Sequence, residues 1–282
     1  MLGLDADKED KRLNRLVKTV LESSKYRNVC DELIKNIGMR ELSKQQNLKT
    51  AIKSTKNKLH QIGGAYFLEK AKYQLWLEKL RSAKNSGNED LFRDASAEIM
   101  SYHSSTRERL NILDQFYARI FSLLPPIHSI MDVACGFHPL SIPWMPLSNT
   151  VEYYAYDVYK DLIGFLNDFM GMTNVQGYAE TRDVVQRTPE KKADLAFILN
   201  TIPCLEQIEK SAGLKVLNSI NANFLVVSFP VRSLCGREKA MRKHYETRFN
   251  QLTKEKDWSI QRLEFSTELV FLITRKEGAS HE

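Results

Sequence analysis

Apolar residues recur at helical spacing from about Asp7 to Leu124, a region in which Gly and Pro are scarce. One such run comprises Leu13, Leu16, Val17, Val20 and Leu21. Residues three or four positions apart share one face of a helix, so the spacing predicts an all-helical N-terminal half. The paired Gly63 and Gly64 and the polar segment 82–89 predict breaks between helices.

After Leu124 the pattern changes to short apolar runs that alternate with helical periods. The predicted strands cover residues 128–134, 151–157, 174–180, 193–200, 223–229, 259–266 and 268–275, and the predicted helices cover residues 160–171, 205–220 and 237–252. This alternation predicts an α/β fold with a mainly parallel sheet and helices on both faces. No helix separates the last two strands, which predicts an antiparallel pair at the end.

The stretch from Ile130 to Leu140 combines an apolar run with a small-residue turn, as at a strand end that meets a ligand. In the turn Asp132-x-x-x-Gly136, the glycine lets a ligand lie against backbone that carries no Cβ. The next apolar run closes on Asp157, and a carboxylate about 20 residues after a glycine turn can bind the ribose of an adenosyl cofactor. G-x-G-x-x-G is absent, so the turn favours S-adenosylmethionine over a dinucleotide. The alternative is a plain strand end with a solvated Asp157.

The chain carries 41 Lys and Arg against 35 Asp and Glu, a net charge of +6. Between Lys35 and Lys58 the single acid is Glu41, and a run this one-sided repels itself unless it is solvated or faces phosphates. We favour an RNA-facing surface over a solvated helix face. The basic residues of this run are Lys35, Arg40, Lys44, Lys49, Lys53, Lys56 and Lys58. A second basic cluster, for which an ordinary amphipathic helix is the alternative, comprises Arg232, Arg237, Lys239, Arg242, Lys243 and Arg248.

The segment before the apolar run that starts at Leu110 has the composition of a helix start. Ser105 or Thr106 is a candidate N-cap, and Glu108 would complete a capping box from Ser105. A cap leaves the neighbouring arginines unexplained. One of them is suited to bind a ligand carboxylate through two charge-assisted hydrogen bonds.

Cysteine spacing and hydropathy bear on compartment and metal binding. Cys30, Cys135, Cys204 and Cys235 show neither a C-x-x-C pair nor the spacing of a zinc site, so we expect reduced thiols and no metal. No apolar run reaches the length of a membrane span, and the charged N-terminus lacks the apolar segment of a signal peptide. We therefore expect a cytoplasmic protein. Cys204 follows a proline, as does the nucleophile of cytosine-5 methyltransferases, but we favour packing as its role.

Several motifs taken together resemble the aminoglycoside-resistance 16S rRNA methyltransferases, the ArmA and Rmt group. The matching stretches are 58–61 (KLHQ), 103–106 (HSST), 108–109 (ER), 135–137 (CGF), 139–140 (PL), 228–230 (SFP), 233–234 (SL), 236–237 (GR), Lys239 and 268–270 (ELV). They extend in one order over nearly the whole chain. At His138 the group usually has Asn, and at Asn200 it often has Lys, so the chain resembles a divergent member.

The resemblance implies a class I S-adenosylmethionine-dependent methyltransferase fold, with a Rossmann-like seven-stranded sheet over residues 105–282. It implies an N-terminal helical domain over residues 1–104 that docks on rRNA. The resemblance also implies roles for three residues of the methyltransferase fold. Arg109 would bind the cofactor's methionine carboxylate, Asp157 would bind the ribose, and Asp183 would lie near the adenine. The expected cofactor-binding residues are His103, Ser105, Arg109, Asp132, Ala134, Gly136, Asp157, Val158, Asp183, Val184 and Asn200.

The reaction that the resemblance implies is methylation of N7 of guanine 1405 in the assembled 30S subunit, which confers aminoglycoside resistance. We expect a monomer that needs no metal. Guanine N7 has a lone pair and no hydrogen, so we name no general base; orientation of the reactants can supply roughly 7–11 kcal/mol. The alternatives are an RNA-binding module without activity, a methyltransferase acting on another rRNA base, and a small-molecule methyltransferase.

Overall fold

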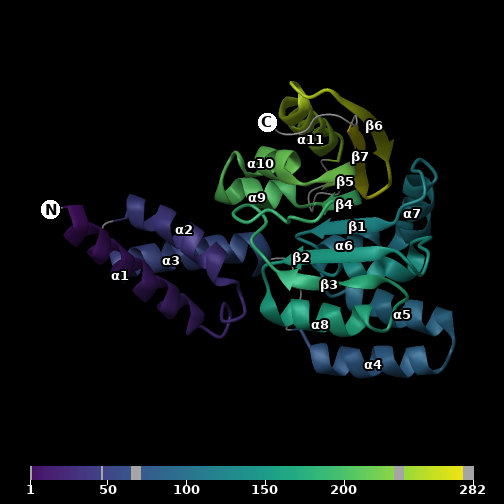
Figure 1. Cartoon of the computed structure of the whole chain (residues 1–282), viewed down its shortest axis with the longest axis horizontal. Coiled ribbons are helices and arrows are strands. Elements are labelled where there is room, and N and C mark those ends of the chain that lie inside the picture. Colours follow the sequence, from purple (N-terminus) through teal and green to yellow (C-terminus); the bar gives the residue numbers. More distant parts are fainter. Residues whose placement is uncertain (1, 46, 65–70, 232–237, 276–282) are drawn as a thin grey trace.

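The structure is a computed structural model of the 282-residue chain, and it describes residues 2–45, 47–64, 71–231 and 238–275. In this part of the chain, seven strands form one sheet in the order β3-β2-β1-β4-β5-β7-β6 (Figure 1). Strands β1 to β5 are parallel, whereas β7 is antiparallel to both β5 and β6. The strands are β1 Ser129–Val133, β2 Glu152–Asp157, β3 Gln176–Thr181, β4 Ala193–Leu199, β5 Ala222–Pro230, β6 Trp258–Glu264 and β7 Glu268–Arg275. The predicted α/β fold and its terminal antiparallel pair are confirmed.

Helices make up the N-terminal half, as predicted, and connect the strands in the rest of the chain. Before the sheet come α1 Leu2–Leu21, α2 Asp31–Lys44, α3 Leu48–Leu59, the π-helix η1 His60–Gly64, α4 Tyr73–Asn85, α5 Glu89–Met100, α6 Ser104–Arg109, the 3-10 helix η2 Leu110–Ile112 and α7 Leu113–Phe121. Within the α/β region lie the 3-10 helix η3 His138–Trp144, α8 Lys160–Met170, α9 Ile202–Ile208, α10 Ala212–Ser219 and α11 Glu238–Thr253.

The buried apolar residues form three cores. Helices α4, α5, α7 and α8 cover one face of the sheet, where Trp76 and Phe92 join one continuous core with Tyr153. Helices α9, α10 and α11 cover the other face. Helices α1, α2 and α3 have a core of their own around Leu16 and Ile34, and they project from one side of the sheet (Figure 1).

This division differs from the predicted boundary at residue 104. Helices α4 and α5 share the core of the sheet, so the division falls between Gly64 and residue 71. Helical periodicity shows that a segment has an apolar face but not which core that face joins. We call Leu2–Gly64 the N-terminal domain and residues 71–275 the sheet domain.

Three local predictions were wrong. The predicted helix 205–220 is two helices, since Glu209 ends α9 and its carboxylate binds Ser211 and Lys215 in the next segment. The loop between α4 and α5 covers only residues 86–88 and not the predicted 82–89, because α4 continues to Asn85 and the Asn88 side chain caps the start of α5. Ser105 and Thr106 do not cap a helix but lie inside α6, which begins after His103.

Candidate active site

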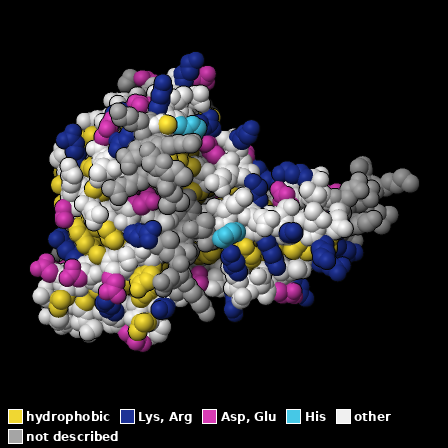
Figure 2. Space-filling model, turned by 180° about the vertical axis from the view of Figure 1, so that it is seen from behind, with side chains coloured by type: hydrophobic (Ala, Val, Ile, Leu, Met, Phe, Trp, Pro, Cys, Tyr) yellow, Lys and Arg dark blue, Asp and Glu magenta, His cyan; other side chains and the backbone are white. Residues whose placement is uncertain are grey.

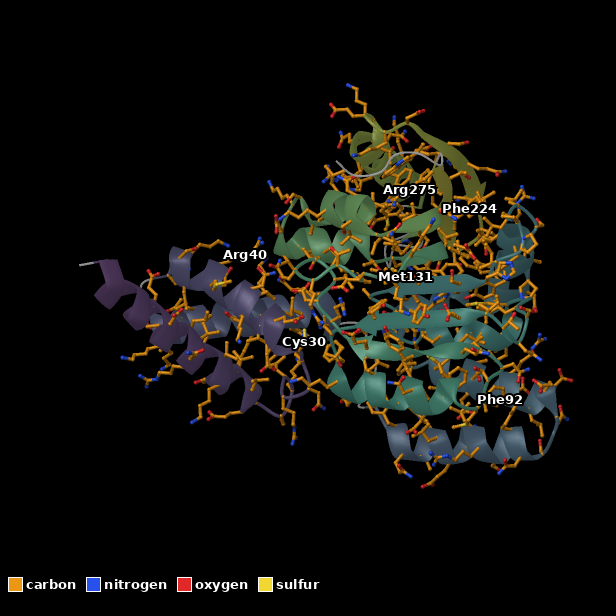
Figure 3. The ribbon with its side chains drawn as sticks, in the orientation of Figure 1. Cys30, Arg40, Phe92, Met131, Phe224 and Arg275 are labelled. Carbon is orange, nitrogen blue, oxygen red and sulfur yellow. The ribbon has the colours of Figure 1, made fainter. Side chains whose placement is uncertain are left out.

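The carboxyl ends of β1, β2 and β4 border one pocket, as expected at this edge of a parallel sheet. Met131, labelled in Figure 3, lies within β1, whose end supplies the pocket's first turn. All the residues that sequence reasoning assigned to the cofactor line this pocket: His103, Ser105, Arg109, Asp132, Ala134, Gly136, Asp157, Val158, Asp183, Val184 and Asn200. The fold therefore brings all the predicted residues to one pocket, and their contact with a cofactor stays a prediction.

The turn after β1 depends on glycine for two reasons. Gly136 has φ of 52°, in the left-handed region that side chains disfavour. A Cβ at this position would lie 3.1 Å from the His103 ring. The glycine therefore makes room for the His103 ring, and the prediction that it also makes room for a ligand stays a prediction. Burial, and then the charge of Arg109, lower the pKa of His103 to about 4, so the ring is neutral at pH 7.

Asp157 ties the ends of β1 and β2 together. Its Oδ2 accepts a hydrogen bond from Gly136 N at 2.9 Å, and its Oδ1 accepts from Val158 N at 2.7 Å and Tyr159 N at 3.3 Å. Burial raises the pKa of Asp157, although these N–H donors oppose the shift. The alternative of a solvated Asp157 is wrong, since the residue is buried. A carboxylate offers about four acceptor positions, which leaves one for a ligand hydroxyl.

Arg109 and Glu268 form an ion pair with no solvent exposure, in which Arg109 Nη2 lies 2.6 Å from Glu268 Oε1. Burial disfavours the guanidinium charge, but Glu268 and other neighbours raise the pKa of Arg109 overall. Among the described residues, Nε and Nη1 of Arg109 have no hydrogen-bond partner. Unpaired buried donors are costly, so this guanidinium at the pocket wall is suited to an anionic ligand.

Asp183 lies after β3 at the nucleoside end of the predicted site. Its Oδ1 accepts from Val185 N at 3.1 Å. Burial raises the pKa of Asp183, while hydrogen bonds from Val185, Gln186 and the Asn36 side chain oppose that shift. Asn36 belongs to α2, so the N-terminal domain reaches the acid that was predicted to lie near the adenine.

A chain of buried hydrogen bonds fixes the pocket wall around His138. Asp132 Oδ2 accepts from Tyr153 Oη and pairs with His138 Nδ1, both at 2.8 Å. His138 Nε2 lies 2.7 Å from Tyr117 Oη, which also contacts Ser141 Oγ at 2.5 Å. A satisfied network of this kind holds one arrangement of its members. Asp132 therefore positions the turn and η3, besides lining the pocket.

Asn200 joins three elements at the end of β4. The residue has φ of 55°, and its Nδ2 donates to Ser105 Oγ at 3.1 Å. Its Oδ1 accepts from Ser228 Oγ at 3.4 Å, and its carbonyl accepts from Cys204 Sγ at 3.3 Å. The contact of Cys204 supports the packing role that we favoured.

The prediction did not include every residue of this site, and four of those it left out bear on the domain junction and on Arg109. Leu33, Ile62 and Gly63 of the N-terminal domain line the pocket, and Glu268 pairs with Arg109. Leu33 has the spacing of a core residue, and Glu268 lies far along the chain from its partner. Glu268 stands in the matching stretch 268–270, but that match assigned it no role, and local spacing does not distinguish Leu33, Ile62 and Gly63 from ordinary structural residues.

The predicted RNA-binding residues fall into distinct groups. Lys35, Lys44 and Lys53 are exposed, and Lys56 is half-buried on α3. Arg40 and Lys58 instead bind the sheet domain, through Glu209 and the Gln207 carbonyl. Arg242 binds Glu264 and the Phe265 carbonyl, and Lys239 belongs to α11. Arg232 and Arg237 lie outside the described residues. RNA contact by any of them stays a prediction.

The sheet order and the pocket at its carboxyl edge are those of a class I S-adenosylmethionine-dependent methyltransferase. The residues fit that cofactor: unpaired Arg109 donors suit the methionine carboxylate, and Asp157 has acceptor capacity for the ribose. We call the pocket the cofactor pocket. Among the described residues, no group of His, Cys, Asp and Glu could hold a metal, and no helix is long and apolar enough to cross a bilayer.

Comparisons with known proteins define the family. The family model for ribosomal RNA methyltransferases named FmrO matches residues 22–272. Proteins named 16S rRNA (guanine(1405)-N(7))-methyltransferase are 33% identical in Micromonospora echinospora, over 94% of this chain and 97% of theirs, and 33% identical in Frankia casuarinae, over 95% of both. The crystal structure of the 16S rRNA methyltransferase RmtF with S-adenosyl-L-homocysteine covers 94% of this chain and 98% of its own, with 28% identity and a TM-score of 0.79. The chain belongs to the FmrO family of ribosomal RNA methyltransferases.

Proposed function

We propose that this protein transfers a methyl group from S-adenosylmethionine to N7 of guanine 1405 in the 16S rRNA of the assembled 30S subunit. The observation that carries the proposal is the cofactor pocket with Arg109 and Asp157 in place, in a chain that matches the named enzymes over almost its whole length. We expect the enzyme to act as a monomer in the cytoplasm, where the 30S subunit is found, and to need no metal.

The residues of the pocket act by binding and orientation. S-adenosylmethionine, when bound, supplies an electrophilic methyl group on a sulfonium. Guanine N7 has a lone pair and needs no deprotonation, so no residue has to remove a proton. Arg109 would hold the methionine carboxylate and Asp157 the ribose, on the two sides of the sulfonium, and this would orient the methyl group for attack in line. Orientation of this kind can supply roughly 7–11 kcal/mol of the reduction in the barrier.

The rRNA is bound by positive surface. The exposed Lys35, Lys44 and Lys53 belong to the projecting helices, over which Figure 2 shows Lys and Arg side chains gathered. Contacts of lysine with phosphate release counterions and provide affinity without sequence preference. They also offset the few kcal/mol needed to turn a base out of its stack.

The proposed product explains resistance. N7 is a hydrogen-bond acceptor on the major-groove edge of guanine. Methylation removes this acceptor and adds bulk and a positive charge. A polycationic aminoglycoside bound there loses a contact and meets repulsion, so cells that carry the modification are expected to survive the drug.

The test is to map the modified nucleotide. Purified protein is incubated with 30S subunits and S-adenosylmethionine, and the rRNA is then reduced and cleaved at 7-methylguanine. We expect a single new scission at guanine 1405, lost in Asp157→Ala. Methylation at a different base, or of free nucleosides, contradicts the proposal; a protein that binds the cofactor without methylating rRNA supports an RNA-binding module instead.

A further inference from the structure

We propose that the N-terminal domain is part of the cofactor site, so that cofactor binding and the docked position of this domain stabilise each other. The inference rests on the cofactor class of the sheet domain and not on the identity of the methylated base. It assigns Arg40 and Glu209 a positioning role at the junction of the domains, in place of the RNA contact predicted for Arg40.

Part of the pocket wall comes from the N-terminal domain. Leu33 on α2 and Ile62 on η1 line the same pocket as Asp157 and Asp183 of the sheet domain. Leu33 is buried, in a core that also includes Ile62 and Val158. The wall at this end of the pocket is therefore complete only while the two domains are docked.

Backbone hydrogen bonds join the two domains next to Asp157, the residue predicted to bind the cofactor ribose. Cys30 N donates to Val158 O at 2.8 Å, and Lys160 N donates to Asn28 O at 2.7 Å. The two segments thus form a short antiparallel bridge directly after β2. Figure 3 shows Cys30 at this junction. A shift of the N-terminal domain would therefore displace residues 158–160, in which the first two N–H groups help to position the Asp157 carboxylate.

A second contact between the domains adjoins the pocket at the end of α9. Arg40 pairs with Glu209 and donates to Ile208 O at 3.5 Å, while Lys58 donates to Gln207 O at 3.1 Å. Figure 3 shows Arg40 on the side of the N-terminal domain that faces α9. Ile208 itself lines the pocket. The two contacts bracket the nucleoside end of the cofactor site.

The same residues link directly to Asp183. Arg40 Nε donates to Asn36 Oδ1 at 3.0 Å, and the Asn36 side chain reaches Asp183. Asp183 N donates to Glu32 Oε2 at 3.4 Å, and Glu32 pairs with Arg187 at 3.0 Å. A ligand that touches both domains binds the docked arrangement better, so it must stabilise that arrangement by the same factor.

The first test measures the affinity of the full chain for S-adenosyl-L-homocysteine by calorimetry, without ribosomes. Arg40→Ala and Glu209→Ala are each expected to lower the affinity about fivefold, at the lower end of coupling between sites. The double variant should lose less affinity than the sum of the two single losses, because each single variant already removes the contact that Arg40 and Glu209 share. Lys44→Ala is the matched control, one turn along the same helix and paired only within it; its affinity should equal that of the wild type.

The second test needs no variant and so does not depend on how a variant folds. Amide hydrogen exchange of the wild-type protein is measured with and without S-adenosyl-L-homocysteine. We expect slower exchange at residues 28–37 and 60–64 as well as at the turn of Gly136. Protection of the Gly136 turn alone, together with unchanged affinity in Arg40→Ala, overturns the inference. Neither result depends on which rRNA base is methylated, so the proposed function can fail separately.

Discussion

At one end of the cofactor pocket, Arg109 and Glu268 are both fully buried inside the sheet domain, whereas at the other end the wall is shared with the N-terminal domain. The first end has a fixed ion pair, and the unpaired donors of Arg109 are available to an anionic ligand. The second end is apolar, at Leu33 and Ile62, and is held by partly exposed ion pairs. Buried pairs are rigid and costly to break, while exposed pairs contribute little each. We therefore expect the first end to provide fixed donors for the ligand anion. At the second end, we expect cofactor affinity to depend on the position of the N-terminal domain.

The largest predicted effect is at the buried end. Arg109→Ala removes the guanidinium that we propose binds the methionine carboxylate, and it leaves Glu268 buried without its partner. Loss of one partner of a buried pair costs about 3–5 kcal/mol of stability. Binding of S-adenosyl-L-homocysteine should fall below detection by calorimetry. Arg107→Ala, an exposed arginine in the same helix, is the control and should change neither quantity.

A pH effect should follow from His103, also at the buried end. Its pKa of about 4 lies below the usual value of 6.5, so the unfolded chain binds the proton more readily than the native protein. The free energy of unfolding is therefore undiminished above pH 6.5. As the pH falls from 6.5 toward 4, it declines by about 3 kcal/mol in total through the titration of His103. Urea unfolding at pH 7 and pH 5 measures it. His103→Gln should have the shallower pH dependence; equal dependence in both proteins would refute the assignment.

A smaller effect is expected at the turn beside that histidine. Gly136→Ala adds a Cβ in the left-handed region, which costs about 1–2 kcal/mol, and brings it against the His103 ring. Gly87→Ala is matched, because Gly87 has φ of 69° and open space around its Cβ position. Thermal unfolding should therefore show a larger loss for Gly136→Ala, and only this variant should bind the cofactor product more weakly. Equal losses would show that the His103 contact is unimportant.

The smallest predicted effect is on the outer face of the N-terminal domain. Lys53→Ala removes one exposed charge of α3, which should raise the KM for 30S subunits several-fold and reduce the salt dependence of binding by about one phosphate contact. Affinity for S-adenosyl-L-homocysteine should not change. Lys79→Ala, which removes an exposed charge of α4 paired with Glu98, is the control. A loss of cofactor affinity in Lys53→Ala would place the domain junction, and not RNA, at this face.

The glycine turn and the acid after the next strand were predictable because both lie at strand ends, and the chain order of strands brings such ends together in a parallel sheet. Gly136 and Asp157 meet through a single hydrogen bond. The sequence did not predict that Asp157 has a structural role, in which its carboxylate accepts hydrogen bonds from the turn of Gly136 and from the N–H groups of its own loop. Nor did it predict that the His103 ring lies next to the glycine.

The rest of the site depends on contacts between distant segments. Arg109 and Glu268 are separated by more than half of the chain. Each stands in a stretch that resembles the family, but nothing in the local pattern pairs one with the other. Leu33 reads as a core position of an amphipathic helix, which it also is. Arg40 stands in a basic run, and only the fold shows that it faces Glu209. Local periodicity cannot reveal such pairings.

A crystal structure of the full chain with S-adenosyl-L-homocysteine tests the central claim most directly. The account predicts the carboxylate of this compound against the free donors of Arg109, its ribose at Asp157, and its adenine between Val184 and the Leu33 and Ile62 side chains of the docked N-terminal domain. A compound bound elsewhere, or bound in this pocket with α2 and η1 away from the adenine, would contradict it.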